Sequence, residues 1–107
     1  MSDYIEEVKK LHLELDKVSR QDNCYYDFRS IVRKMLEIIP TATREVPFLV
    51  NTYELANTLN HEVEDIKWYQ DLKNKKNAPK KRTDDYWNAV KNAKGLIELN
   101  IFSIIHG

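Results

Sequence analysis

Residues 25–40 read YYDFRSIVRKMLEIIP, and this stretch decides the fold class. Its apolar side chains return every three or four residues, which is the period of an α-helix that buries one face. Asp22 is the expected N-cap of this helix, and Pro40 its expected end. The stripe is wide, so we expect this helix to be the most buried one. Its members are Tyr25, Phe28, Ile31, Val32, Met35, Leu36, Ile38 and Ile39.

Three other segments show the same helical period. The first is expected to begin near Asp3 and Glu6, which form a capping box, and to end at Val18. The second is expected to begin with Pro47 in its first turn and to reach about Leu72, as the longest element. The third is expected to begin at Thr83. In each segment, a line of side chains that we call the seam is expected to face the core. The seams are, in order, Tyr4, Val8, Leu11, Leu15 and Val18, then Leu49, Thr52, Ala56, Leu59, Val63 and Ile66, then Tyr86, Trp87, Val90, Ala93, Ile97, Ile101 and Ile104.

The composition agrees with long helices. The chain has 107 residues, with only two glycines and three prolines, too few for a β-rich fold with many tight turns. We therefore expect one helical domain over residues 1–107, an all-α antiparallel four-helix bundle with a long third helix and a basic loop before the last helix.

Charge and cysteine content limit the functional classes. Seventeen Lys and Arg balance seventeen Asp and Glu, so no field of the whole molecule attracts nucleic acid or a membrane. Cys24 is the single cysteine and cannot form an intrachain disulfide, and the N-terminus lacks the pattern of a signal peptide. We expect a cytoplasmic protein without a membrane span. The residue usage hints at a phage or low-GC bacterial origin.

The C-terminal segment 95–105 is more apolar than one bundle face requires. A second stripe lies beside the core seam, and it belongs either to a deeply buried terminal helix or to an interface with another copy or another protein. Gly95 within this helix suggests close packing or a kink. The predicted interface consists of Leu96, Leu99, Phe102 and Ile105.

Segment 73–82 contains six cations and no acid, and it is expected to form a loop. Aromatic residues flank it on both sides, so it could hold nucleic acid or an acidic protein surface, although a solvated loop has the same composition. The predicted basic patch consists of Lys73, Lys75, Lys76, Lys80, Lys81 and Arg82.

Segment 52–69 resembles the generic helix-turn-helix pattern, with Asn60 at the turn. Two residues contradict it: His61 stands where an apolar residue is usual, and Val63 would be exposed. An uninterrupted helix explains both, and we favour it.

No pattern indicates catalysis, a metal site or a cofactor. His12, His61 and His106 are far apart in the sequence, and no Glu-x-x-His pair is present. Glu62 and Asp65 have a spacing similar to that of magnesium-binding all-α nucleotide pyrophosphohydrolases, but the Glu-Glu-x-x-Glu motif of that family is absent. A solvated acidic face is the better interpretation.

We therefore expect a small non-enzymatic interaction protein, a regulator, inhibitor or adaptor, that binds a protein partner and self-associates. The alternative is a nucleic-acid-binding regulator that uses segment 52–69 and the basic loop 73–82.

Overall fold

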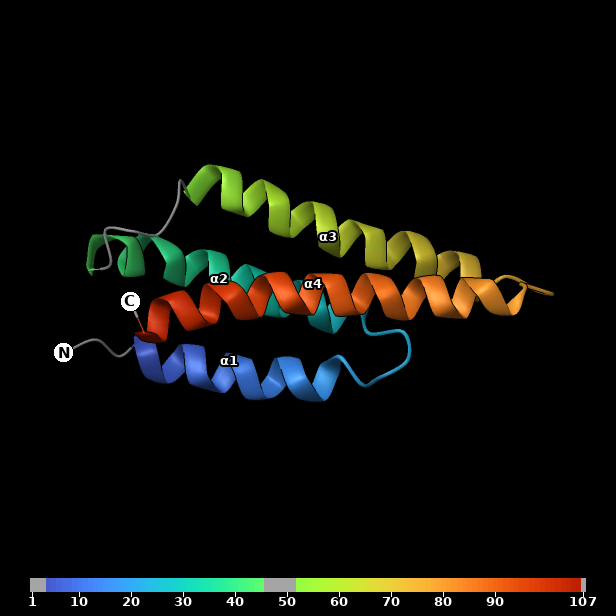
Figure 1. The fold of residues 1–107 in the computed structure, drawn as a ribbon, viewed down its shortest axis with the longest axis horizontal. Coiled ribbons are helices and arrows are strands. Elements are labelled where there is room, and N and C mark those ends of the chain that lie inside the picture. The colour runs from blue at the N-terminus through green and yellow to red at the C-terminus, as the bar shows by residue number, and fades with distance from the viewer. Residues whose placement is uncertain (1–3, 46–51, 107) are drawn as a thin grey trace.

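The computed structural model describes residues 4–45 and 52–106, and all of its regular secondary structure there is helical. The four helices are α1 (Tyr4–Val18), α2 (Tyr25–Glu45), α3 (Thr52–Lys73) and α4 (Lys80–His106). They lie side by side along the long axis of a molecule that measures 52 × 24 × 17 Å (Figure 1). The prediction of an all-α fold with four helices is confirmed.

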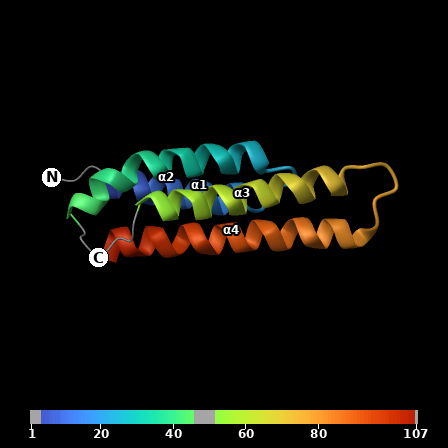
Figure 2. The same cartoon turned by 90° about the horizontal axis from the view of Figure 1, so that it is seen from above.

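The helices pack around one shared core. α1 contacts α2 and α4, and α3 also contacts α2 and α4, so each helix has two main neighbours. Figure 2 shows this arrangement from above, with α3 beside α4 along most of its length. Most of the described seam residues lie in the core, which consists of Val8, Leu11, Leu15, Cys24, Tyr25, Phe28, Ile31, Val32, Met35, Ile38, Leu59, Val63, Ile66, Tyr86, Ala89, Val90, Ala93, Ile97 and Ile101.

The ends of α2 differ from those predicted. The helix begins at Tyr25, and the amide of Phe28 donates to the carbonyl of Cys24, so Asp22 is not the N-cap. At the other end α2 continues through Pro40 to Glu45. A proline within a helix removes one backbone hydrogen bond. The loss does not end α2, because Met35 and Ile38 anchor the preceding turns in the core.

The predicted start of α4 is also wrong, since the helix begins at Lys80 and not at Thr83. Pro79 directly precedes it, and the carbonyl of Pro79 accepts a hydrogen bond from the amide of Arg82 at 2.9 Å. The fixed φ of Pro79 is compatible with a helical turn, so α4 begins at Lys80, three residues before the N-cap expected at Thr83. With 27 residues, α4 is longer than α3, which has 22. The predicted start at Pro47 lies outside the described residues.

Candidate functional site

The C-terminal half of α4 has two large apolar side chains that are exposed among the described residues. Leu99 is 66% exposed and Phe102 is 45% exposed. Leu96 and Ile105, the other two residues of the predicted interface, are half-buried and pack against the core. The predicted stripe is thus divided between the core and the surface. We call Gly95, Leu99 and Phe102, which follow one another at helical spacing along the outside of α4, the α4 face.

Side chains of α1 support the α4 face from one side. The His12 ring packs edge-on against Phe102, with ring centroids 5.7 Å apart. The His12 Nε2 atom lies 3.6 Å from a carboxylate oxygen of Glu98. Lys94 bridges the same helices, 2.7 Å from Asp16 and 3.7 Å from Glu98. The His12 ring thus places Phe102 against α1, and the ion pairs of Lys94 join the same two helices.

The pKa of Asp16 follows from this contact. The hydrogen bond from Lys94 and the charge of Lys94 hold the pKa of the Asp16 carboxyl below its ordinary value. The carboxylate therefore stays charged, and keeps its ion pair, through neutral and mildly acidic pH.

The opposite end of the bundle contains a polar cluster that sequence reasoning missed. The Lys73 ammonium lies 2.8 Å from the Asp22 carboxylate and donates to the side-chain oxygens of Asn23 and Asn74 at 2.8 and 2.9 Å. It also lies 4.8 Å from the centre of the Tyr86 ring. We call these four polar residues, Asp22, Asn23, Lys73 and Asn74, the loop lock, because they join the α1–α2 loop to the end of α3.

Tyr86 extends this cluster into the core. Its hydroxyl accepts a hydrogen bond from the amide of Cys24 and lies within 3.0 Å of the carbonyl of Gln21 and of the Cys24 Sγ atom. A hydroxyl has one proton, and the carbonyl is the stronger acceptor. Burial raises the pKa of Tyr86, and burial also raises the pKa of the Cys24 thiol. A buried thiol with a raised pKa is a poor nucleophile, so Cys24 acts here as a core residue.

Two hydrogen bonds from Tyr25 join α2 to α3. The amide of Tyr25 donates to the side-chain oxygen of Gln70 at 3.1 Å, and the Tyr25 hydroxyl donates to Glu64 at 2.9 Å. Both partners come from α3, so Tyr25 fixes the start of α2 against that helix. These groups are paired with one another, and the arrangement supports a structural role.

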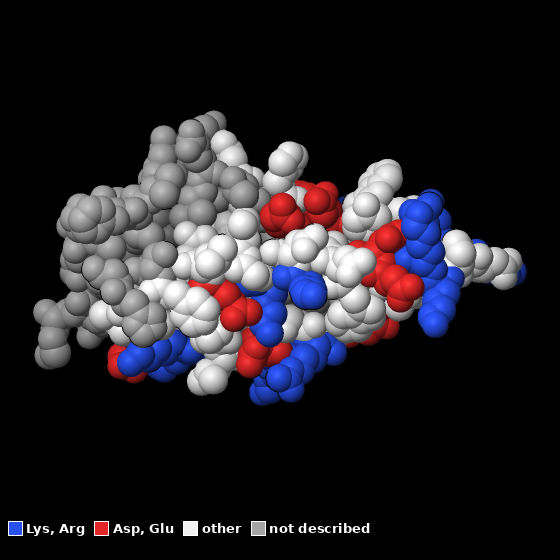
Figure 3. All heavy atoms as spheres, viewed as in Figure 1, with Lys and Arg blue, Asp and Glu red and all other residues white. Residues whose placement is uncertain are grey.

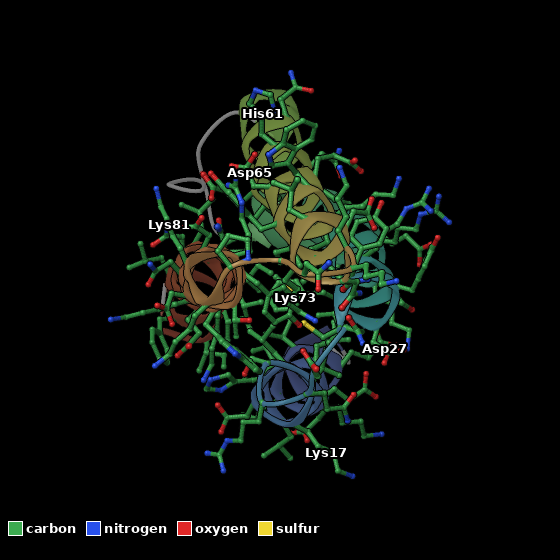
Figure 4. The ribbon with its side chains drawn as sticks, turned by 90° about the vertical axis from the view of Figure 1, so that its right-hand side faces the viewer. Lys17, Asp27, His61, Asp65, Lys73 and Lys81 are labelled. Atoms are coloured by element: carbon green, nitrogen blue, oxygen red, sulfur yellow. The ribbon has the colours of Figure 1, made fainter. Side chains whose placement is uncertain are left out.

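The predicted basic patch separates into inward and outward cations. The Lys73 side chain is only 5% exposed and belongs to the loop lock, and Arg82 lies 3.6 Å from Asp85. Figure 4 shows Lys73 between the helices and Lys81 at the outer edge of the same end. Within the described part of the chain, no ion pair reaches the remaining four exposed cations. We call these four, Lys75, Lys76, Lys80 and Lys81, the basic tip.

Figure 3 shows one group of Lys and Arg side chains near the right-hand end of the visible face, the end at which the α3–α4 loop lies in Figure 1, and further groups at the centre and along the lower edge. Acidic side chains lie next to them on the bundle. The basic tip is thus a local feature of one end.

The structure decides between the two interpretations of segment 52–69. α3 is one helix from Thr52 to Lys73, with Val63 buried and His61 exposed. The preferred continuous helix is confirmed, and the helix-turn-helix alternative is wrong. Burial of the seam of α3 stabilises the helix more than Asn60 favours a turn, because a break at Asn60 would expose Val63.

The other surfaces of the described residues give weaker indications of a binding site. A groove of about 500 Å³ between α1 and α2 has Leu11 and Ile38 at its base and side chains of both charges at its rim. In the described ranges, no three His, Cys, Asp or Glu side chains are grouped as metal ligands would be. No helix there is both long and apolar enough to cross a membrane. Large apolar side chains are also exposed away from the α4 face, at Leu13, Tyr26, Trp68 and Trp87.

We compared the chain with known proteins in three ways. No protein-family model matches it, and no match was found among curated proteins or among solved structures.

Proposed function

We propose that this chain is a small non-enzymatic interaction protein that binds a protein partner through the α4 face and self-associates there. The observation that carries the proposal is the exposure of Leu99 and Phe102, three residues apart on one helix. Adjacent large apolar side chains on a surface are typical of contact sites, and aromatic residues in particular act as anchors. The contacts of His12 and Lys94 that join α1 to α4 give this surface a rigid support.

The wider setting belongs to the same proposal. We propose an antiparallel bundle, which is supported by the two main neighbours of each helix and by the short connections 19–24 and 74–79. We also propose a cytoplasmic location, where a lone cysteine stays reduced. The basic tip would speed the encounter with an acidic partner without forming the centre of the interface.

Substitution of Phe102 tests the proposal. Phe102→Asp places a charge at the centre of the α4 face, so we expect the self-associated species to become monomeric in light scattering coupled to size exclusion. Leu13→Asp is the matched control, because Leu13 is 72% exposed on α1 and lies outside the α4 face. Circular dichroism verifies that both variants stay helical. A parent protein that is monomeric at every concentration, or a Phe102→Asp variant that associates like the parent, contradicts self-association.

A second candidate function, binding of nucleic acid, is favoured by the basic tip alone. Four ammonium groups without ion pairs can neutralise phosphates, and the logarithm of the binding constant would then fall with the logarithm of salt concentration with a slope of about −3.6 on duplex DNA. Replacing Lys80 and Lys81 by Gln should halve this slope, whereas replacing the exposed Lys10 and Lys17 should leave it unchanged. Binding without salt dependence excludes this candidate.

A further inference from the structure

Nothing in the described part of the chain explains a glycine at position 95. It lies in the interior of α4 and is exposed, and a Cβ atom built on it would meet nothing within 4 Å. Its backbone does not adopt the positive φ that favours glycine. Glycine destabilises a helix interior relative to alanine, because its backbone loses more conformational freedom. The missing side chain therefore leaves room for something outside this chain.

Gly95 is aligned with the two exposed apolar side chains. Residues four and then three positions apart share one line along a helix, and Gly95, Leu99 and Phe102 have this spacing. The line thus contains a notch at Gly95 and a large ring at Phe102, about 10 Å apart along the helix at 1.5 Å per residue. A surface that has both a notch and a projecting ring is complementary to a two-fold related copy of itself.

An antiparallel crossing joins the two features. With Phe102 of one copy over Gly95 of the other, Leu99 meets Leu99 of the second copy near the two-fold axis. A parallel crossing would place Gly95 against Gly95 and leave a gap, and it would place the exposed Lys91 against its own counterpart. The antiparallel crossing brings Lys91 to the last turn of the second α4, where the helix end carries partial negative charge.

Glu98 borders the face and would approach its counterpart near the axis. Within each copy its carboxylate lies 3.7 Å from the Lys94 ammonium, and this ion pair reduces the repulsion between the two carboxylates. Charge complementarity at Lys91 and the ion pair at Glu98 therefore both permit the antiparallel pairing.

We infer that the α4 face is occupied by α4 of a second copy of this chain, antiparallel, with Phe102 of each copy seated over Gly95 of the other. This inference rests on the proposed function, because it needs the α4 face to be an interface. A single pair of helices buries little area, so we expect a dimer that dissociates at concentrations on the order of micromolar.

The test uses the opposite effects of one methyl group on folding and on association. Gly95→Ala should raise the Tm of the monomer by about 4 °C through helix propensity, because open space surrounds the position. The same variant should weaken the dimer about 5- to 100-fold, since the methyl group fills the notch, and Gly95→Leu should abolish the dimer. Asn88→Ala, two turns away on the same exposed surface, should leave the dimerisation constant unchanged. Analytical ultracentrifugation measures the constant, and thermal denaturation of dilute protein measures the Tm.

The outcomes separate this inference from the proposed function. If Phe102→Asp dissociates the dimer while Gly95→Ala and Gly95→Leu associate within twofold of the parent, the α4 face is an interface but the notch is not part of it. If the parent is monomeric, both the inference and self-association fail.

Orientation is measured independently, with a spin label at Asn88→Cys. The native Cys24 is buried and should stay unlabelled in the folded protein. The antiparallel crossing places the two labelled positions about 30 Å apart along the helices, and a parallel crossing places them about 10 Å apart. The shorter distance overturns the inference.

Discussion

The hydroxyl of Tyr86 gives the sharpest prediction about stability. Tyr86→Phe keeps the buried ring, including its contact with the Lys73 ammonium, and removes only the oxygen. That oxygen accepts a hydrogen bond from the amide of Cys24 and donates one to the carbonyl of Gln21, each at 3.0 Å. The variant loses two hydrogen bonds, and the buried amide is left without its partner.

The magnitude follows from these two losses. An unpaired buried amide costs about 1–3 kcal/mol, and the loss of a further hydrogen bond costs about 1 kcal/mol. We therefore expect Tyr86→Phe to lower the free energy of unfolding by about 2–4 kcal/mol, which corresponds to about 8–16 °C in Tm for a domain of this size.

Urea denaturation, followed by circular dichroism, measures the free energy of unfolding, and the m-value should not change. Tyr26→Phe is the matched control, because Tyr26 is 67% exposed and its hydroxyl stays hydrated. A loss below about 0.5 kcal/mol in Tyr86→Phe, or an equal loss in Tyr26→Phe, would refute the reasoning, because 0.5 kcal/mol is the lower limit for one ordinary hydrogen bond.

Three further predictions concern other described residues. Lys73→Met removes the ammonium of the loop lock and should lower the free energy of unfolding by about 1–2 kcal/mol in the same assay. An increase in stability would show that the cost of burying the ammonium exceeds the stabilisation from its contacts. Cys24 is buried, so it should react with a thiol reagent only as fast as the protein opens, and a native protein that reacts as fast as the denatured one contradicts this. Burial raises the pKa of its thiol, so the stability that the protonated thiol contributes should be complete below pH 9.0 and should decline above it. Pro40→Ala restores a backbone donor within α2 and should raise the free energy of unfolding by about 1–3 kcal/mol, and a lower Tm would contradict the helical backbone at this position.

The spacing of apolar residues was sufficient to predict the helices and most of the core. Val8, Leu15, Val32 and Ile97 each lie on a predicted seam, and each is buried in the bundle. Burial of one face sets this spacing along the whole length of a helix, so an error of a few residues at an end does not hide it.

The ends of the helices and the polar cluster could not be predicted in the same way. Pro40 and Thr83 are local signals, and packing or a neighbouring proline outweighs them. The inward position of Lys73 depends on Asp22, which is fifty-one residues away in the sequence. Such a contact has no periodic signature, so the composition of segment 73–82 alone suggested six outward cations.

The candidate site was found from the sequence only in outline. The apolar excess on α4 indicated a second stripe, but it did not show that Leu96 turns toward the core while Leu99 turns outward. That division depends on how the neighbouring helices flank α4.

The basic tip concentrates exposed positive charge at one end of this formally neutral protein. Six of the seventeen cations and none of the seventeen acids lie in residues 73–82, so the rest of the chain carries eleven cations against seventeen acids. The segment spans the α3–α4 loop at one extremity of the elongated bundle (Figure 1). We expect such a protein to meet an anionic surface with this end first, because attraction between charges is strongest at short range. At pH 7 and low salt, a cation-exchange resin should therefore retain the protein although its formal net charge is zero.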